Sequence, residues 1–195
     1  MWFIGGRIAK MGSEREFYWI DNERELSSWF AAQKGSRYLA IDTEFERDRT
    51  YFPELQLIQL ATSSSVALID FLSLPSTVLL NKTISEYDTN IVLHAARQDL
   101  EVLAFSGVKL QPPVFDTQIA AALAGLTDQI GYADIVRDTL GVHLEKTETR
   151  SDWGRRPLTQ AQLDYAVDDV CYLIPVLEKL KTDLQNLGRF SWFEE

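Results

Sequence analysis

The sequence is poor in cysteine and histidine, with one cysteine, Cys171, and two histidines in 195 residues. One cysteine cannot form an intramolecular disulfide, and together with two histidines it cannot complete a Cys/His zinc cluster. The sequence also lacks any hydrophobic run near the about 20 residues that a membrane span requires, so no membrane association is expected. The lack of disulfides favours a reducing compartment, the cytoplasm.

Basic residues are too few to balance the acidic ones, and the formal net charge is −10. This charge argues against a protein that binds nucleic acid through bulk electrostatics. It does not exclude a nuclease, because catalytic carboxylates contribute to the negative charge and bound metal ions offset it.

The composition, 46% hydrophobic and 25% charged, is that of a chain that folds around a core. The length suits one domain, which we expect over residues 17–195, preceded by an N-terminal extension at 1–16. No basic region precedes Trp2, Phe3 and Ile4, so the extension does not resemble a signal peptide. It is either an extra edge strand or a remnant of an expression vector.

Apolar and alternating runs predict five strands, at residues 17–20, 38–42, 55–60, 66–69 and 91–93. Capping residues predict a helix after Asp21 or Asn22, helices at 75–87, 97–105, 117–124 and 132–140, and a long last helix capped by Thr159. Pro175 is expected to kink or restart the last helix, and residues 45–53 to form a loop. This order predicts an α/β sandwich around a mixed sheet.

An apolar run ends in two carboxylates, Asp42 and Glu44, at the end of the strand predicted at 38–42. Side chains two apart on a strand point to the same face, so the two carboxylates lie side by side and repel each other. A divalent cation such as Mg²⁺ or Mn²⁺ reverses this balance, because it prefers carboxylate oxygens. Solvated surface carboxylates are the alternative interpretation of the pair.

Other acidic residues also allow either a metal-site or a purely structural interpretation. Asp99 lies near the start of the helix at 97–105, where the helix dipole favours an anion. Tyr165 and Asp169 lie four residues apart on the last helix and share a face, as a metal-site pair or an ordinary hydrogen-bonded pair. The neighbouring Asp168 leaves open which of the two aspartates faces the sheet. His94 is interpreted as a core residue without a catalytic role.

The order of these residues resembles the motifs of the DEDDy 3′–5′ exonucleases, and most closely those of the ribonuclease D family. The similar segments are Asp42-Thr43-Glu44-Phe45, His94-Ala95-Ala96-Arg97-Gln98-Asp99 and Tyr165-Ala166-Val167-Asp168-Asp169, with Arg49–Leu60, Phe115–Gln118, Lys146–Trp153 and Arg156–Leu158 between them. The resemblance extends over about residues 17 to 180. Each short motif is weak by itself, but all of them in order within one domain form a specific signal.

The resemblance implies a ribonuclease H-like fold, a three-layer sandwich with a mixed five-stranded sheet and helices on both faces. It also implies a site for two divalent metal ions, Mg²⁺ or Mn²⁺, which in such sites lie about 3.5–4 Å apart. By similarity, Asp42 bridges both metals, Glu44 and Asp169 hold the metal that activates water, and Asp99 supports the second. Tyr165 orients the nucleophilic water, and Asp168 has no role.

The implied activity is hydrolysis of RNA from its 3′ end to nucleoside 5′-monophosphates, as in RNA or tRNA processing or the degradation of short oligonucleotides. Single-stranded RNA 3′ ends are the implied partner, with DNA or short oligonucleotides as variants. The residues expected to contact nucleic acid are Thr43, Phe45, Lys146, Arg150, Arg155 and Arg156. A solvated basic loop is the alternative interpretation of the four basic residues.

Two other classes of function stay open at this point. One is a catalytically silent nuclease-fold module that binds RNA or a protein partner, although the complete set of motif residues argues against it. The other is an acidic structural domain without a site. Ribonuclease D carries helical HRDC domains after its nuclease domain and this sequence stops at Glu195. It is therefore either a stand-alone exonuclease or a chain from which the remainder is absent. The sequence does not specify an oligomeric state.

Overall fold

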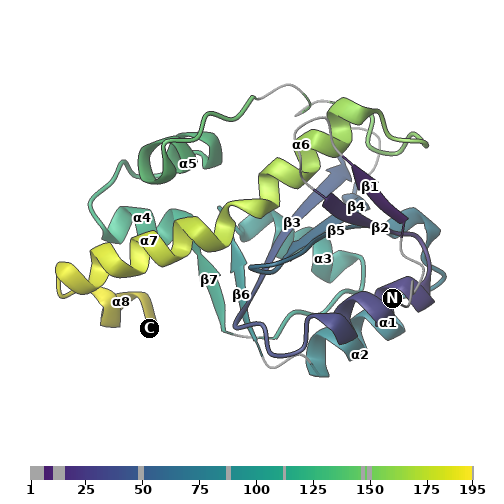
Figure 1. Cartoon of the computed structure of the whole chain (residues 1–195), viewed down its shortest axis with the longest axis horizontal. Helices are drawn as coiled ribbons and strands as arrows, with labels where there is room; N and C mark the ends of the chain where they lie inside the picture. Colours follow the sequence, from purple (N-terminus) through teal and green to yellow (C-terminus); the bar gives the residue numbers. More distant parts are fainter. Residues whose placement is uncertain are drawn as a thin grey trace.

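A seven-stranded mixed sheet forms the middle layer of the molecule (Figure 1). The structure, a computed structural model, describes residues 7–10, 16–47, 51–86, 89–111, 113–145, 148 and 151–194. The strand order is β1-β2-β5-β4-β3-β6-β7. The strands are β1 (Arg7–Lys10), β2 (Glu16–Ile20), β3 (Tyr38–Glu46), β4 (Glu54–Ala61), β5 (Val66–Asp70), β6 (Asn90–Leu93) and β7 (Val114–Asp116).

The five predicted strands are all present, and β1 and β7 add one strand to each edge of the sheet. β3, β4 and β5 pair in antiparallel fashion, whereas β2 pairs with β5, and β6 with β3 and β7, in parallel. The prediction missed β7 because it has only three half-buried residues and no alternating pattern. β1 pairs antiparallel with β2, so residues 7–10 of the N-terminal extension form an edge strand.

The helices lie on both faces of the sheet, as the predicted fold class requires (Figure 1). They are α1 (Glu23–Ala32), α2 (Val78–Glu86), α3 (Arg97–Phe105), α4 (Thr117–Leu123), α5 (Tyr132–Leu140), α6 (Gln160–Cys171), α7 (Leu173–Asn186) and α8 (Phe190–Glu194), with a 3₁₀ turn at Phe71–Ser73. Asn22 caps α1, because its Oδ1 accepts a hydrogen bond of 3.0 Å from the Glu25 amide. The helix expected at 75–87 begins only at Val78.

The long last helix is interrupted where Pro175 predicts. A proline ring collides with the carbonyl group four residues earlier, which here belongs to Cys171. α6 ends at Cys171 and α7 begins at Leu173, so that Pro175 lies in the first turn of α7, where no backbone donor is needed. Thr159 and Gln162 form a capping box at the start of α6. The interruption between α6 and α7 therefore originates in Pro175.

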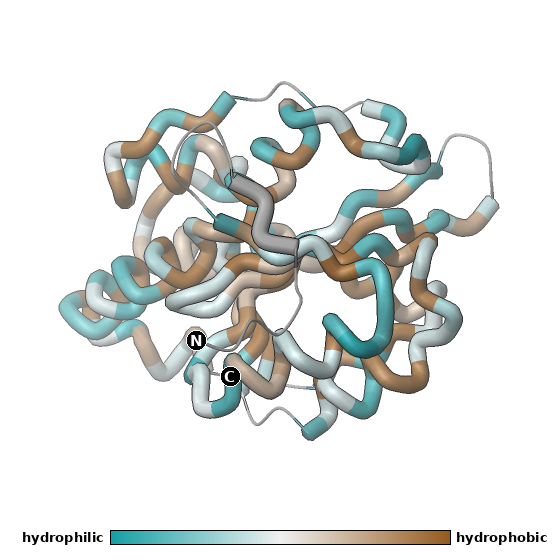
Figure 2. Tube along the Cα trace, turned by 45° about the vertical axis from the view of Figure 1, so that its right-hand side comes forward, coloured by the Kyte–Doolittle hydropathy of each residue, from teal (hydrophilic) through white to brown (hydrophobic). Residues whose placement is uncertain are grey.

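Alternation along β3 determines which face each side chain reaches. Leu39 and Ile41 pack with α1, α2 and α3, whereas Tyr38 and Ala40 pack with α6 and α7 on the opposite face. Hydrophobic positions accordingly run through the strands at the centre of the molecule in Figure 2. Among the described helices, none has both the length and the apolar character needed to cross a bilayer. By the same alternation, residues 42 and 44 emerge under α6.

Candidate active site

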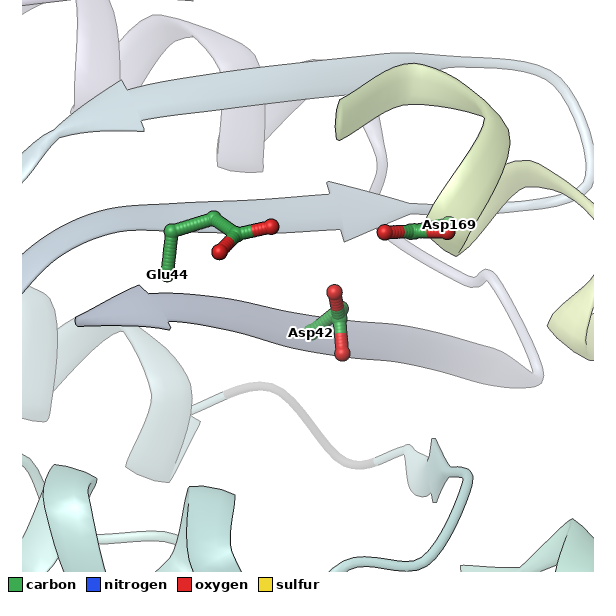
Figure 3. Close-up of side chains that lie close together, drawn as sticks. All are labelled: Asp42, Glu44 and Asp169. Carbon is green, nitrogen blue, oxygen red and sulfur yellow. The ribbon is translucent and has the colours of Figure 1, made fainter. Parts of the chain in front are cut away.

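Three carboxylates from two elements meet between β3 and α6. Asp42 and Glu44 project from β3, Asp169 projects from α6, and the three side chains face one another (Figure 3). Each offers an oxygen, and these oxygens lie within 4.8 Å of one another. All three residues are half-buried. The structure thus brings together three of the four predicted acidic ligands, and it selects Asp169 rather than Asp168 for this cluster.

The fourth predicted acid, Asp99, lines the same pocket from α3 but does not belong to the close cluster. Its Oδ1 accepts a hydrogen bond of 2.5 Å from the Thr43 hydroxyl group. Thr43 lies between Asp42 and Glu44 on β3, so alternation directs it to the face of the sheet that α3 covers. β3 therefore presents Asp42 and Glu44 on one face, and through Thr43 on its other face it positions Asp99.

The turn before α3 is held by Asp116, at the end of β7. Its two carboxylate oxygens accept hydrogen bonds from the amides of Ala95 at 3.0 Å and Ala96 at 2.9 Å. Asp116 Oδ1 also accepts a hydrogen bond of 2.8 Å from the Gln118 amide, and Asp116 thereby caps α4. Ala95 has a φ of 53°, a conformation that costs a non-glycine residue about 1–3 kcal/mol. Asp116 thus stabilises a strained turn that places Asp99 in the pocket.

Tyr165 lines the pocket one helical turn before Asp169. Its hydroxyl group donates a hydrogen bond to the Asp169 carboxylate and so lowers the pKa of that group. The ring lies 6.0 Å, centroid to centroid, from the ring of Trp153, which is buried under α6. The four-residue spacing read from the sequence therefore corresponds to a direct contact in the structure.

Burial raises the pKa of all four acids in the pocket, and repulsion among them adds to the effect at Asp42 and Glu44. Burial raises the pKa of Asp42 well above its usual range, and the charges of Asp99, Asp169 and Glu44 add to the effect. Burial, followed by the charges of Asp169 and Asp99, raises the pKa of Glu44 to about 9. Burial raises the pKa of Asp169 to about 7, despite the Tyr165 hydrogen bond, and also raises the pKa of Asp99. In their ionised forms these groups destabilise one another.

The pocket encloses about 280 Å³, and no lysine or arginine is among its described lining residues. Four carboxylates without a protein cation are an unfavourable arrangement unless another positive charge is bound. Carboxylate oxygens are the ligands that hard divalent cations prefer. The residues present therefore fit a divalent metal ion.

The remaining walls of the pocket are partly aromatic. Among their residues, Phe45 was expected to contact nucleic acid, whereas no role was predicted for His94, Gln98 and Tyr132. Phe45, His94, Gln98 and Tyr132 line it beside the acids. His94 bonds through Nε2 to the Ile130 carbonyl at 3.0 Å, so this nitrogen carries the proton. Burial lowers the pKa of His94, which keeps the ring neutral. Tyr132 comes from α5, and no motif in the sequence connects it with the acids.

The four basic residues expected to contact nucleic acid differ in their surroundings. Lys146 and Arg150 lie outside the described residues. Arg155 is exposed. Arg156 faces inward: Nη2 donates to Asp70 Oδ1 at 2.7 Å and to the Gln56 carbonyl at 3.0 Å, and Nη1 donates to the Trp153 carbonyl at 2.6 Å.

These contacts give Arg156 a structural function, and its contact with nucleic acid stays a prediction. The pairing of β3 with β4 shifts between Glu44 and Phe45, which frees the Gln56 carbonyl from the ladder. Arg156 bonds to that carbonyl and neutralises Asp70, whose side chain is only 5% exposed. Sequence reasoning missed this because Asp70 lies 86 residues away. Arg156 therefore has a structural role.

Arg156→Met is expected to lower the free energy of unfolding by about 2–4 kcal/mol, because it leaves a buried carboxylate unpaired and a carbonyl unsatisfied. The estimate lies below that for a fully buried pair, since the Arg156 side chain is 23% exposed. Urea unfolding measures the change. Arg155→Met, one residue away and exposed, is the matched control and should change stability by less than about 0.5 kcal/mol. Equal stabilities of the two variants would contradict the structural role.

A comparison with known families identifies the domain. A model described as 3′–5′ exonuclease matches residues 17–185, which include all four acids and Tyr165. The chain belongs to the 3′–5′ exonuclease family. The exonuclease domain therefore occupies most of this chain, and the resemblance read from its motifs is confirmed.

The exonuclease domain is similar in sequence to curated ribonuclease D proteins. The ribonuclease D of Xanthomonas oryzae is 41% identical over 178 residues, which cover 91% of this chain and 49% of the relative. The crystal structure of Escherichia coli ribonuclease D, an exoribonuclease involved in structured RNA processing, matches with a TM-score of 0.84 and 38% identity. That match covers 89% of this chain and 46% of the other. The chain thus spans about half the length of the ribonuclease D proteins that it matches.

Another similar structure is covered over most of its length. The structure of Brucella melitensis NrnC bound to pGG matches the exonuclease domain with a TM-score of 0.70 and 32% identity, over 83% of this chain and 80% of that one. The same protein with bound Mg²⁺ matches with a TM-score of 0.71 and 28% identity, over the same shares. The ribonuclease H-like α/β fold expected from the sequence is confirmed by these structures, with seven strands in place of five.

Proposed function

We propose that this chain is a metal-dependent 3′–5′ exoribonuclease that releases nucleoside 5′-monophosphates from RNA 3′ ends. The observation that supports this most strongly is the cluster of Asp42, Glu44 and Asp169, with Asp99 in the same pocket and no described lysine or arginine beside them. Membership of the 3′–5′ exonuclease family supports the direction of cleavage. The active domain is residues 17–195.

The metals of the proposal are two Mg²⁺ or Mn²⁺ ions, held by Asp42, Glu44, Asp99 and Asp169. When bound, such ions activate a water molecule and neutralise charge on the attacking and leaving oxygens. A relative, NrnC of Brucella melitensis, is known with bound Mg²⁺, which supports a divalent ion here. The raised pKa values of Asp42 and Glu44 imply that both groups ionise fully only when cations are present.

The other lining residues act on the substrate and the water. The Tyr165 hydroxyl group, anchored on Asp169, orients the water for attack on the phosphorus atom. A phenol, whose reference pKa in water is about 10, suits positioning rather than complete proton removal at neutral pH. Phe45 lies beside the acids and presents an aromatic surface for the terminal base. Thr43 acts indirectly, because its hydroxyl group holds Asp99.

The proposed substrates are single-stranded RNA 3′ ends or short oligonucleotides. The similarity to Escherichia coli ribonuclease D, an exoribonuclease involved in structured RNA processing, supports RNA processing, and the similarity to pGG-bound NrnC supports short oligonucleotides. The pocket volume of about 280 Å³ suits the last nucleotides of a strand rather than a duplex. With its single cysteine, the chain suits the reducing cytoplasm, which we propose as its compartment.

Incubation with 5′-labelled single-stranded RNA and DNA, in Mg²⁺, Mn²⁺ or EDTA, tests the proposed function. The expected result is a ladder of RNA products that shortens from the 3′ end and disappears in EDTA. RNA binding without shortening would identify a catalytically silent module instead. Neither binding nor cleavage would leave only a structural role for the fold.

Tyr165→Phe is expected to reduce kcat by a factor on the order of 10–1,000, the range of one positioned proton-handling group. The ring that packs near Trp153 is retained, and only the hydroxyl group at Asp169 is removed. Metal affinity, measured by calorimetry, should change little. A kcat equal to that of the wild type would show that the water is oriented without this hydroxyl group.

A further inference from the structure

Three exposed aromatic side chains form a cluster beside the pocket, and the site described above does not use them. The exposed fractions are 93% for Tyr51, 53% for Phe52 and 54% for Phe105. The ring centroids are 4.9 Å apart for Tyr51 and Phe52, and 4.8 Å apart for Phe52 and Phe105. Apolar groups gathered on a surface in this way commonly mark a binding site.

The aromatic cluster, Tyr51, Phe52 and Phe105, is continuous with the pocket along α3. Gln98, Glu101 and Phe105 follow one another at helical spacing and share one face of α3, and Gln98 lines the pocket. From Gln98 to Phe105 the helix rises by about 10 Å. That length corresponds to about three stacked nucleotides.

A second connection runs from the end of β3. Arg47 donates to Glu101 Oε2 at 3.0 Å, and its guanidinium group lies 5.6 Å from the centre of the Phe45 ring, which lines the pocket. The path from the acids therefore passes Phe45 and the Arg47–Glu101 pair and reaches Phe105. Because Arg47 is paired with a carboxylate, the described residues along this path offer little net positive charge to a phosphate backbone.

We propose that the aromatic cluster stacks the bases of single-stranded RNA a few nucleotides upstream of the 3′ end held in the pocket. The inference rests on the proposed function for the direction of the strand. A chain with a net charge of −10 attracts a polyanion only weakly, so it needs contacts that do not depend on phosphate charge. Stacking on aromatic rings supplies such contacts and tolerates any base sequence, because every base has a π-face.

Binding of a fluorescent 8-nucleotide single-stranded RNA in EDTA tests this inference apart from catalysis. Intact RNA is compared with RNA that has abasic sites at the third and fourth positions from the 3′ end. The wild type should bind the abasic RNA about 5- to 100-fold more weakly, the range for loss of one stacked base. Phe105→Ala should bind both RNAs equally, at the lower affinity, because the stacking surface is gone.

Two controls separate stacking from general apolar contact and from damage to the fold. Phe105→Trp keeps an aromatic surface and should retain the preference for intact RNA, whereas Phe105→Leu should lose it. Trp192→Ala removes an aromatic side chain of similar exposure, 57%, from α8, away from the pocket-lining residues. Trp192→Ala should therefore bind both RNAs as the wild type does.

Several outcomes would overturn the inference. They are equal binding of intact and abasic RNA by the wild type, no measurable binding of the 8-nucleotide RNA, and an unchanged preference in Phe105→Ala. A dimer that Phe105→Ala dissociates, with RNA binding unchanged, would overturn it in favour of a contact with a second copy of the chain. Cleavage in Mg²⁺ is read separately. A stacking effect without cleavage would refute the proposed function alone, and cleavage without a stacking effect would refute this inference alone.

Discussion

Asp42→Asn is expected to reduce 3′-end cleavage below detection. Asp42 is the acid whose charge interacts with all the others in the pocket, because Asp99, Asp169 and Glu44 each raise its pKa. The amide keeps the size of the side chain and removes one negative charge from the proposed metal site. The measurement is single-turnover degradation of 5′-labelled RNA in saturating Mg²⁺. Activity close to that of the wild type would remove Asp42 from the site.

The same substitution is expected to stabilise the fold when metal is absent. In the folded state the pKa of Asp42 is raised above its unfolded value, so the ionised group destabilises the protein at pH values above the unfolded pKa, near 4. In EDTA at pH 7–8, Asp42→Asn should therefore have a higher Tm than the wild type. Each 1 kcal/mol of relief raises the Tm by about 2–4 °C in a chain of this size.

The pH dependence gives this prediction a defined sign. Because the folded state binds a proton at Asp42 that the unfolded state releases above pH 4, the cost of this proton uptake falls as the pH falls toward 4, and the Tm advantage of Asp42→Asn should shrink toward zero. In Mg²⁺ the order should reverse, because an ion that binds the folded wild type stabilises it by mass action. Asp128→Asn, in the exposed loop between α4 and α5, controls for net charge. A Tm difference that does not vary with pH would contradict the electrostatic origin.

The sequence predicted the site to the extent that the site follows from local periodicity. Asp42 and Glu44 share a face because a strand alternates, and Tyr165 contacts Asp169 because a helix repeats after about four residues. The break between α6 and α7 follows from Pro175 in the same way. In each case the deciding information lies within a few residues of the chain.

Contacts between distant elements were not predictable. Arg156 resembles a basic surface residue until Asp70 and the freed Gln56 carbonyl are placed beside it by the register shift in β4. Asp116 holds the turn before α3 because β7 pairs in parallel with β6. Tyr132 reaches the pocket from α5, where its hydroxyl group donates to the Asp168 carbonyl on α6. These contacts depend on tertiary packing, which single-residue patterns do not encode. The choice between Asp168 and Asp169 needed the resemblance to ribonuclease D for the same reason.

The carboxylate of Asp168 has a different environment from that of Asp169. On a helix, neighbouring residues differ by about 100° in direction, so only one of the two is able to face β3. Asp169 does so and joins Asp42 and Glu44, whereas the Asp168 carbonyl accepts a hydrogen bond from the Tyr132 hydroxyl group at 3.0 Å. That contact uses the backbone and does not require the Asp168 carboxylate. The two aspartates therefore offer a matched pair of substitutions.

Asp169→Asn is expected to lower kcat by more than about 10³-fold, the upper end of the cost of removing one charge-stabilising group. Asp168→Asn, the same chemical change one residue away, should leave kcat within about threefold. Because the Asp168 charge raises the pKa of Asp169, Asp168→Asn should also move the acid limb of the pH–rate profile to lower pH. The two pH profiles, recorded in Mg²⁺ with equal metal occupancy, measure both effects. The reverse ranking would mean that α6 presents Asp168, not Asp169, to the acids of β3.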